Sequence, residues 1–247
     1  MSDRKIQRLI KDAPRGQPFD PAMLRSFEIS PAQTTYLVNA GWLQRLSKGA
    51  YLVAGDVASV EGIITYLSRR IPGLHIGGKT ALDWQGARHN VAFRPKMTLW
   101  ASKAYRFPAW IEQHMPYTFQ TTQLFDDQYS VTQWLRPLPF KSAHVLVSVP
   151  ELALLELASD IGKRGKKGQS LDEAVHLADT LRNLRIDVLS SLLDNCARVK
   201  VVKLVRDLGQ SSGYAWGEDL QKYVNRLSQG KRWSSKGTEG KRLTLKP

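Results

Sequence analysis

Two short stretches of the sequence match patterns that occur in enzymes and nucleotide-binding proteins. Residues 73–80 read Gly-Leu-His-Ile-Gly-Gly-Lys-Thr and fit the P-loop pattern G-x-x-x-x-G-K-[ST]. In a P-loop the backbone N–H groups surround phosphate, which would place Lys79 on the outer phosphates and Thr80 on magnesium. Residues 209–213 fit G-x-S-x-G, the pattern of the nucleophile elbow of hydrolases. Both patterns need a specific surrounding structure before they can act.

The context of residues 73–80 argues against a P-loop. A P-loop follows an apolar strand, whereas residues 69–72 read Arg-Arg-Ile-Pro and end an expected helix. No apolar strand ending in aspartate follows to supply a second magnesium ligand. A strand over residues 74–76, a Gly-Gly turn and a helix explain the same letters, so we predict a structural role. A P-loop nucleotide-binding protein with a DNA-binding head stays open as an alternative.

The other residues able to do chemistry are scattered along the sequence. Residues 209–213 follow an expected helix, so Gly209 is interpreted as the C-cap of that helix and not as part of a nucleophile elbow. The five histidines are isolated and lack metal-ligand spacing. The single cysteine, Cys196, excludes a disulfide framework and a cysteine-rich zinc site. The sequence therefore predicts no enzyme, no cofactor and no metal.

The charge balance indicates an anionic partner. The chain of 247 residues has 36 Lys and Arg against 22 Asp and Glu, which is a formal net charge of +14. Nucleic acid is the first expectation, followed by a membrane surface and an acidic protein. The N-terminus shows no apolar signal segment, and no stretch approaches the length of apolar sequence that crosses a bilayer. We therefore expect a cytoplasmic protein with no membrane partner.

The first 55 residues carry the signals of a winged helix-turn-helix. Apolar residues at helical spacing over 4–11 predict a short amphipathic helix. Asp20 and Ser30 are each an N-cap followed by proline at the first helical position, and the second of these two helices is expected to end near Gly41. Aromatic and branched residues on both sides of the polar turn at 47–49 then predict a hairpin, which is the wing.

The helix that begins after Ser30 is the candidate recognition helix. With Thr34 and Leu37 facing inward, helical geometry places polar side chains on the opposite face. Asn and Gln can pair with adenine in the major groove, and a Thr methyl group can meet the thymine methyl. The helix start suits a phosphate, and the basic wing suits the DNA backbone or minor groove. A solvated helix face is the simpler alternative. The candidate DNA-binding residues are Ser30, Gln33, Thr35, Tyr36, Asn39, Arg45 and Lys48.

Residues 56–247 are expected to form a second, larger domain. Asp56 is expected to cap a helix that runs to about residue 70, and residues 148–151 match a capping box that opens another helix. Strands are predicted at 97–100, 117–119, 131–135 and 144–147, and helices near 171–183, 187–208 and 217–228. The fold class is therefore α+β: an N-terminal winged helix-turn-helix followed by a larger α+β domain, strand-rich first and helical at the C-terminus.

Two groups of basic residues in the second domain form a candidate secondary anion site. One group is the run Lys163, Arg164, Lys166 and Lys167. The other is Lys200, Lys203 and Arg206, spaced by three residues opposite a row of valines. The alternative is that this second group forms an ordinary solvated helix face.

The sequence resembles the AbiEi-type antitoxins of bacterial abortive-infection toxin–antitoxin systems, which are of type IV. The resemblance in the first 55 residues is carried by Ile29-Ser30, Leu37-Val38, Gly41, Leu43, Arg45, Gly49 and Tyr51. Residues 77–82 and 148–151 resemble later segments of the same family, so the similarity spans most of the chain.

The resemblance implies a protein with two tasks. Its winged helix-turn-helix, residues 1–55, would repress its own operon by binding double-stranded operator DNA. Residues 56–247 would counteract a nucleotidyltransferase-like toxin encoded nearby, either by direct contact or through the target of the toxin. The resemblance implies no catalytic residues. A transcription factor that senses a small ligand, without a toxin partner, is the alternative from another functional class.

Overall fold

The structure is a computed structural model of the full chain, and it describes residues 3–88, 96–139, 141–163, 168–227, 233–236 and 242–245. The chain divides into two compact units. The first unit contains residues 1–72, 103–116 and 137–145, and the second contains residues 73–102, 117–136 and 146–247.

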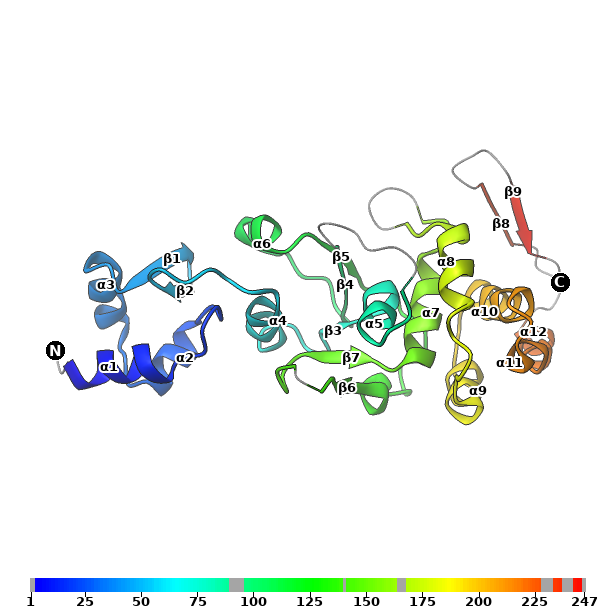
Figure 1. Ribbon diagram of the computed structural model, residues 1–247, viewed down its shortest axis with the longest axis horizontal. Coiled ribbons are helices and arrows are strands. Elements are labelled where there is room, and N and C mark those ends of the chain that lie inside the picture. Colours follow the sequence, from blue (N-terminus) through cyan, green and yellow to red (C-terminus); the bar gives the residue numbers. More distant parts are fainter. Residues whose placement is uncertain are drawn as a thin grey trace. The chain divides into compact units, whose positions relative to one another are not determined.

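The first unit contains the winged helix-turn-helix that the sequence predicts (Figure 1). Asp20 caps α2 by accepting a hydrogen bond from the Met23 N–H at 2.7 Å, and proline occupies the first turn of α2 and of α3. The elements of this unit are α1 (Asp3–Asp12), α2 (Pro21–Ser26), α3 (Pro31–Asn39), β1 (Leu43–Ser47), β2 (Ala50–Val53), α4 (Val60–Ser68) and α6 (Ala109–His114).

Both ends of α3 are fixed by backbone hydrogen bonds. At its start, the Ser30 hydroxyl accepts from the Gln33 N–H at 3.2 Å, and the Gln33 side-chain oxygen accepts from the Ser30 N–H at 2.8 Å. At its end, Gly41 has a φ of +76°, and the N–H groups of Gly41 and Trp42 donate to the carbonyls of Val38 and Leu37. This is a Schellman motif, in which the left-handed residue is usually glycine. The capping box and the glycine turn together set the length of α3.

The wing is a two-stranded antiparallel hairpin, and other parts of the first unit hold its turn. Ser47 of β1 pairs with Ala50 of β2, so Lys48 and Gly49 form the turn. The Arg70 guanidinium donates to the Gly49 carbonyl at 3.1 Å, and the Trp110 indole N–H donates to the Ser47 hydroxyl at 3.2 Å. Arg70, which follows α4, and Trp110, which lies in α6, therefore restrain the wing.

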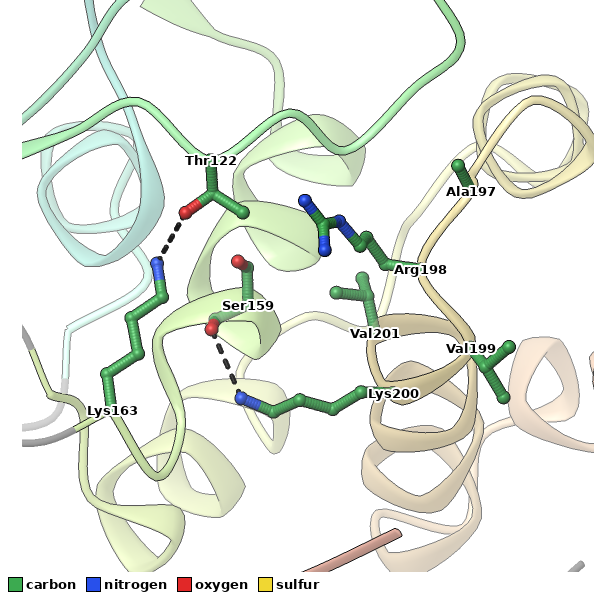
Figure 2. A pocket seen from close by; sticks show the side chains of 8 residues that line it. All are labelled: Thr122, Ser159, Lys163, Ala197, Arg198, Val199, Lys200 and Val201. Carbon is green, nitrogen blue, oxygen red and sulfur yellow. Dashed lines mark hydrogen bonds between the residues drawn. The ribbon is translucent and has the colours of Figure 1, made fainter. Parts of the chain in front are cut away.

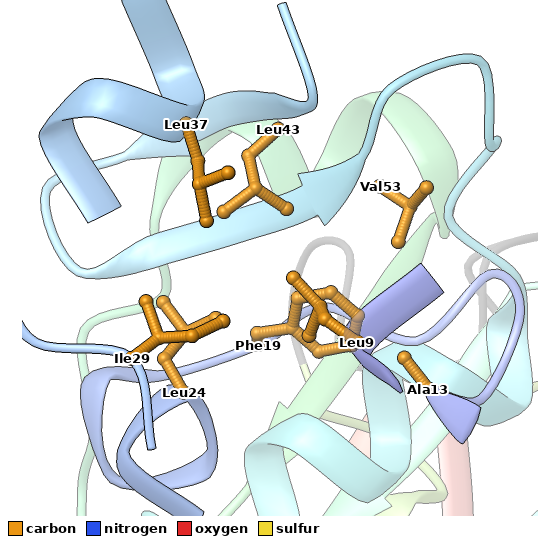
Figure 3. Close-up of a cluster of buried hydrophobic side chains, with 8 residues drawn as sticks. All are labelled: Leu9, Ala13, Phe19, Leu24, Ile29, Leu37, Leu43 and Val53. Atoms are coloured by element: carbon orange, nitrogen blue, oxygen red, sulfur yellow. The ribbon is translucent and has the colours of Figure 1, made fainter. Parts of the chain in front are cut away.

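A hydrophobic cluster connects the three N-terminal helices to the wing (Figure 3). Phe19 and Leu37 are fully buried in it, and Leu24 and Leu43 are nearly so. Phe19 also forms a short β-bridge with Tyr51, with backbone hydrogen bonds of 2.7 and 3.0 Å. Removing a buried leucine from such a cluster costs about 2–5 kcal/mol of stability. The cluster therefore makes the recognition helix and the wing one packed unit.

The second unit is built on a five-stranded mixed sheet with the strand order β5-β4-β3-β7-β6. Strand β3 pairs antiparallel with β4 and parallel with β7, and β4 pairs parallel with β5. Its elements are β3 (His75–Ile76), α5 (Gly78–Trp84), β4 (Met97–Trp100), β5 (Tyr117–Gln120), η1 (Val131–Trp134), β6 (Leu135–Pro137), β7 (Leu146–Ser148), α7 (Pro150–Asp160), α8 (Leu171–Ala178), α9 (Ile186–Asp194), α10 (Val199–Ser211), α11 (Ala215–Glu218), α12 (Gln221–Leu227), β8 (Trp233–Lys236) and β9 (Arg242–Leu245).

Several sequence-based expectations for residues 56–247 are wrong in detail. Residues 131–134 form a 3₁₀ helix and not a strand. None of the four is buried, and strand β6 begins only at Leu135. The cap of α4 is Ser59, which accepts from the Gly62 N–H, whereas Asp56 accepts from Gly16 and Arg15. Residue 149 precedes α7 without any side-chain cap, so residues 148–151 are no capping box. The expected helix over 187–208 is two helices, α9 and α10.

Gly209 lies inside α10 and is not its C-cap. A Cβ atom at this position would lie 2.4 Å from the Trp216 ring and 2.6 Å from the Gly217 Cα atom. Gly209 therefore allows α11 to approach the backbone of α10 closely, which is a packing role that the sequence interpretation missed.

In the part of the chain that the structure describes, no helix is long and apolar enough to cross a membrane.

Candidate nucleic-acid interface

The outer face of α3 carries the polar side chains that the sequence places there. Thr34 and Leu37 are buried, whereas Thr35, Tyr36 and Asn39 are exposed. The Thr35 hydroxyl donates to the Pro31 carbonyl at 3.2 Å within the helix. With its hydroxyl occupied, Thr35 can offer a methyl group for contact with thymine. Tyr36 is 56% exposed, so its ring and hydroxyl are accessible on this face.

Ser30 and Gln33 serve the helix start as well as the candidate interface. Their reciprocal capping bonds occupy the Ser30 hydroxyl and the Gln33 side-chain oxygen as acceptors. The Gln33 side chain can then pair with a base by its oxygen only if the capping box opens. The positive end of α3 remains suited to a phosphate. The structure therefore favours a phosphate-positioning role for these two residues over base reading.

Arg45 and Lys48 lie on the hairpin that forms the wing. Arg45 is an exposed residue of β1, opposite Tyr51 of β2, and Lys48 is exposed in the turn. Long basic side chains on a hairpin beside a recognition helix suit phosphate oxygens or a minor groove. One packed unit thus carries all seven candidate DNA-binding residues.

The sequence interpretation missed residues that support this face. Arg70 and Trp110 restrain the wing, yet they lie 21 or more positions away from it in the sequence. The Arg70 guanidinium also stacks on the Tyr66 ring at 4.5 Å from its centre. Trp42, directly after α3, is 48% exposed. The position of Trp42 after Gly41 was visible in the sequence, whereas the Arg70 and Trp110 contacts depend on tertiary structure.

The residues that match the P-loop pattern are engaged inside the second unit. The Gly78 N–H donates to the buried Glu156 carboxylate at 2.8 Å, so a side chain of the protein accepts the bond that a phosphate would accept. Lys79 pairs with Glu173. The Thr80 hydroxyl accepts from the Thr98 N–H at 2.9 Å. These contacts support the structural interpretation of residues 73–80.

Packing also explains the glycine at position 77, which directly precedes helix α5. A Cβ atom on Gly77 would lie 2.3 Å from a Glu156 oxygen and 2.6 Å from the Trp100 ring. Gly78 has a φ of +50°, a conformation that glycine adopts without strain. Gly78, one of the two glycines that the P-loop pattern requires, and its neighbour Gly77 are thus explained by backbone conformation and packing.

Glu156 also forms a buried ion pair. His75 contacts Glu156 at 2.8 Å through Nε2 and the Gly73 carbonyl at 2.8 Å through Nδ1. Burial lowers the pKa of His75, but the charge and hydrogen bond of Glu156 outweigh burial and raise it overall. The Ser148 hydroxyl donates to the same carboxylate. Strand β3, strand β7 and helix α7 are therefore joined by one polar cluster.

The candidate secondary anion site is only partly brought together. Lys163 and Lys200 lie near one another, on the loop after α7 and at the start of α10. Lys203 is fully buried, and Arg206 is 5% exposed and bonds to Asp207 and Gln221. The alternative of a solvated face is wrong for Lys203 and Arg206, because α10 packs against other helices on several sides. Arg164, Lys166 and Lys167 lie outside the described residues.

Among the described residues, no group of three or more His, Cys, Asp or Glu side chains is placed to hold a metal ion.

The fold and this face define a class of protein. A capped, polar recognition helix packed against a basic hairpin is the arrangement of winged helix-turn-helix DNA-binding proteins, here followed by a larger α+β part. Two family models match consecutive parts of the chain. Residues 2–93 match the N-terminal domain of the AbiEi antitoxin transcriptional regulators, and residues 94–246 match the AbiEi antitoxin transcriptional regulators of type IV toxin–antitoxin systems. The chain belongs to this AbiEi antitoxin family.

One similar solved structure is that of the RV2827C protein from Mycobacterium tuberculosis. The match has a TM-score of 0.60 and 17% sequence identity, and it covers 90% of this chain and 80% of the other. At this identity the similarity shows the fold alone. No curated protein matches the sequence.

Proposed function

We propose that this protein represses its own operon through residues 1–55 and counteracts a nucleotidyltransferase-like toxin through residues 56–247. The observation that carries the first half is the joint placement of an exposed polar face on α3 and two exposed basic side chains on the wing of the same packed unit. Membership of a family of antitoxin transcriptional regulators supports both halves.

The proposed division of labour on DNA follows from the contacts of each side chain. Asn39, Thr35 and Tyr36 are exposed on the outer face of α3 and would meet base edges in the major groove. Ser30 and Gln33, engaged in the capping box, would position a phosphate at the helix start, where the positive end of the α3 dipole attracts it. Arg45 and Lys48 would contact the DNA backbone from the wing. The net charge of +14 adds attraction that is independent of DNA sequence.

A binding assay with the DNA upstream of the gene tests the first half. The full chain is expected to shift this DNA at concentrations at which a scrambled duplex is not shifted. The matched variant Gln44→Ala changes an exposed β1 residue that we do not assign to DNA, and it should bind like the wild type. Equal affinity of the wild type for both duplexes would contradict the repressor assignment.

A co-expression experiment tests the second half. Cells that express the neighbouring toxin gene should be rescued by the full chain and also by a full chain carrying Asn39→Ala and Arg45→Ala. Rescue by this double variant would show that antitoxicity does not need DNA binding. Failure of a folded double variant to rescue would refute the separation of the two tasks. A pull-down with the toxin then distinguishes direct contact from action through the target of the toxin.

A further inference from the structure

A cavity of about 440 Å³ lies within the second unit (Figure 2). The segment after β5, the C-terminal end of α7 and the N-terminal end of α10 surround it. Three of its eight lining residues are cationic and none of the eight is acidic. The lining residues are Thr122, Ser159, Lys163, Ala197, Arg198, Val199, Lys200 and Val201.

Hydrogen bonds hold the two lysines of the cavity in fixed positions. The Lys163 ammonium donates to the Thr122 hydroxyl and to the Asp160 carboxylate, each at 2.8 Å, and to the Gln120 side chain at 3.1 Å. The Lys200 ammonium donates to the carbonyls of Ser159, at 3.2 Å, and Ile161. Both lysines are therefore preorganised, which reduces the entropy lost when an anion binds nearby.

Arg198 completes the cationic lining. Its Nε atom donates to the Gln123 carbonyl at 2.8 Å, and Figure 2 shows the end of its guanidinium group directed into the cavity, toward Thr122 and Ser159. The position of Lys200 is explained by its hydrogen bonds to carbonyls at the C-terminal end of α7. These bonds do not involve Arg198. A guanidinium group presents a planar set of donors that matches the oxygens of a phosphate.

Burial and neighbouring charges shift the pKa values of two groups at the cavity. Burial lowers the pKa of Lys200 to about 8, and the charge of Lys163 acts in the same direction. Burial raises the pKa of Asp160, the carboxylate next to Lys163, to about 6 although Lys163 lowers it. The Asp160 carboxylate pairs with Lys163 and also interacts with the charge of Lys200. The N-terminal end of α10 adds further positive potential.

We propose that this cavity binds a small organic phosphate monoester of the size of a sugar phosphate or a mononucleotide. The phosphate group would lie against the Arg198 guanidinium, within the positive potential of Lys200 and Lys163. The Thr122 and Ser159 hydroxyls would donate to its oxygens or to the sugar. The volume exceeds that of a bare phosphate and suits a ligand with a neutral body, which the side chains of Ala197, Val199 and Val201 can contact. This site is additional to the DNA-binding face and does not depend on it.

Calorimetry on the full chain tests the proposal with ribose 5-phosphate and with ribose, its uncharged counterpart. Ribose 5-phosphate is expected to bind, and ribose is not. Arg198→Gln is expected to weaken binding about tenfold or more, since it removes a charge-assisted contact. The matched control is Arg182→Gln, which removes the same charge from an exposed arginine that does not line the cavity.

A second measurement does not depend on any variant. Because the pKa of Lys200 is near 8, this side chain should react with an amine-labelling reagent at pH 8, and ribose 5-phosphate should protect it. Protection of Lys200, together with the loss of affinity in Arg198→Gln alone, supports the site. The proposal is overturned if ribose 5-phosphate does not bind at millimolar concentration, or if Arg198→Gln and Arg182→Gln bind it equally. It is also overturned if Arg198→Gln weakens duplex DNA binding while the wild type binds no small phosphate, because the cavity residues would then serve the DNA backbone.

Discussion

Replacing Asn39 by alanine should relax DNA specificity without changing the stability of the protein. Asn39 is exposed at the end of α3, and its removal should alter the free energy of unfolding by less than about 0.5 kcal/mol. A good bidentate pair with one base contributes about 1–3 kcal/mol of discrimination, which corresponds to a loss of roughly 5- to 150-fold in the affinity ratio between operator and scrambled DNA.

Gln33→Ala should behave differently. It removes the acceptor of the Ser30 N–H and should lower the stability of the helix start by about 1 kcal/mol.

Arg45→Ala should instead weaken the binding of all sequences alike. Each phosphate contact contributes about 0.9 to the slope of log affinity against log salt. Between 50 and 200 mM salt, one lost contact should therefore change the salt effect by about 3.5-fold. Lys48→Ala should have the same effect, because both side chains are exposed on the wing.

One titration series measures these effects together. Fluorescence anisotropy with operator and scrambled duplexes at several salt concentrations gives the affinity ratio and the slope for each variant, and urea denaturation gives its stability. The reasoning is refuted if Asn39→Ala weakens both duplexes equally while Arg45→Ala affects only the operator. In that case a different face of α3 would contact the DNA.

Three further predictions concern the second unit. Glu156→Gln should lower the free energy of unfolding by about 3 kcal/mol, because it leaves the buried His75 without its charged partner. Urea denaturation at neutral pH measures this, and a change below about 1 kcal/mol would contradict the ion pair. Lys79→Ala should leave the affinity for ATP and GTP unchanged in calorimetry, because Lys79 pairs with a carboxylate of the chain. If the wild type binds either nucleotide with micromolar affinity and the variant does not, the P-loop interpretation would be restored. The pKa of Asp160 is raised on folding, so it stabilises the protein fully below about pH 4 and this contribution is lost as the pH rises through 6. Relative to Asp160→Asn, the wild type should lose on the order of 3 kcal/mol over this range, and parallel pH profiles of the two proteins would exclude the shift.

The winged helix-turn-helix could be predicted because its signals are local. The N-caps at Asp20 and Ser30, the C-terminal Gly41 and the hairpin turn at Gly49 each depend on a few neighbouring residues. Their order along the chain then specifies the motif, and the hydrophobic spacing places Leu37 in the core. The exposed face of α3 follows from the same spacing.

The features that escaped prediction depend on distant residues. Nothing near Lys203 in the sequence shows that other helices surround α10. The sequence interpretation therefore placed this lysine in a candidate anion site or on a solvated face, whereas it is buried. Gly209 matched a helix end because the approach of Trp216 is a tertiary contact. In the same way, the position of Arg198 beside the C-terminal end of α7 depends on tertiary structure and does not follow from the sequence.

The two units are interwoven along the chain. The polypeptide passes from one to the other at residues 72–73, 102–103, 116–117, 136–137 and 145–146. A cut at residues 72–73 would leave residues 1–72 held to the rest of the first unit by non-covalent contacts alone. These contacts include the hydrogen bond from Trp110 to Ser47 and the contact between the Tyr66 and Trp110 rings. Release of the winged helix-turn-helix by a single nick at this point would therefore also require this packing to open.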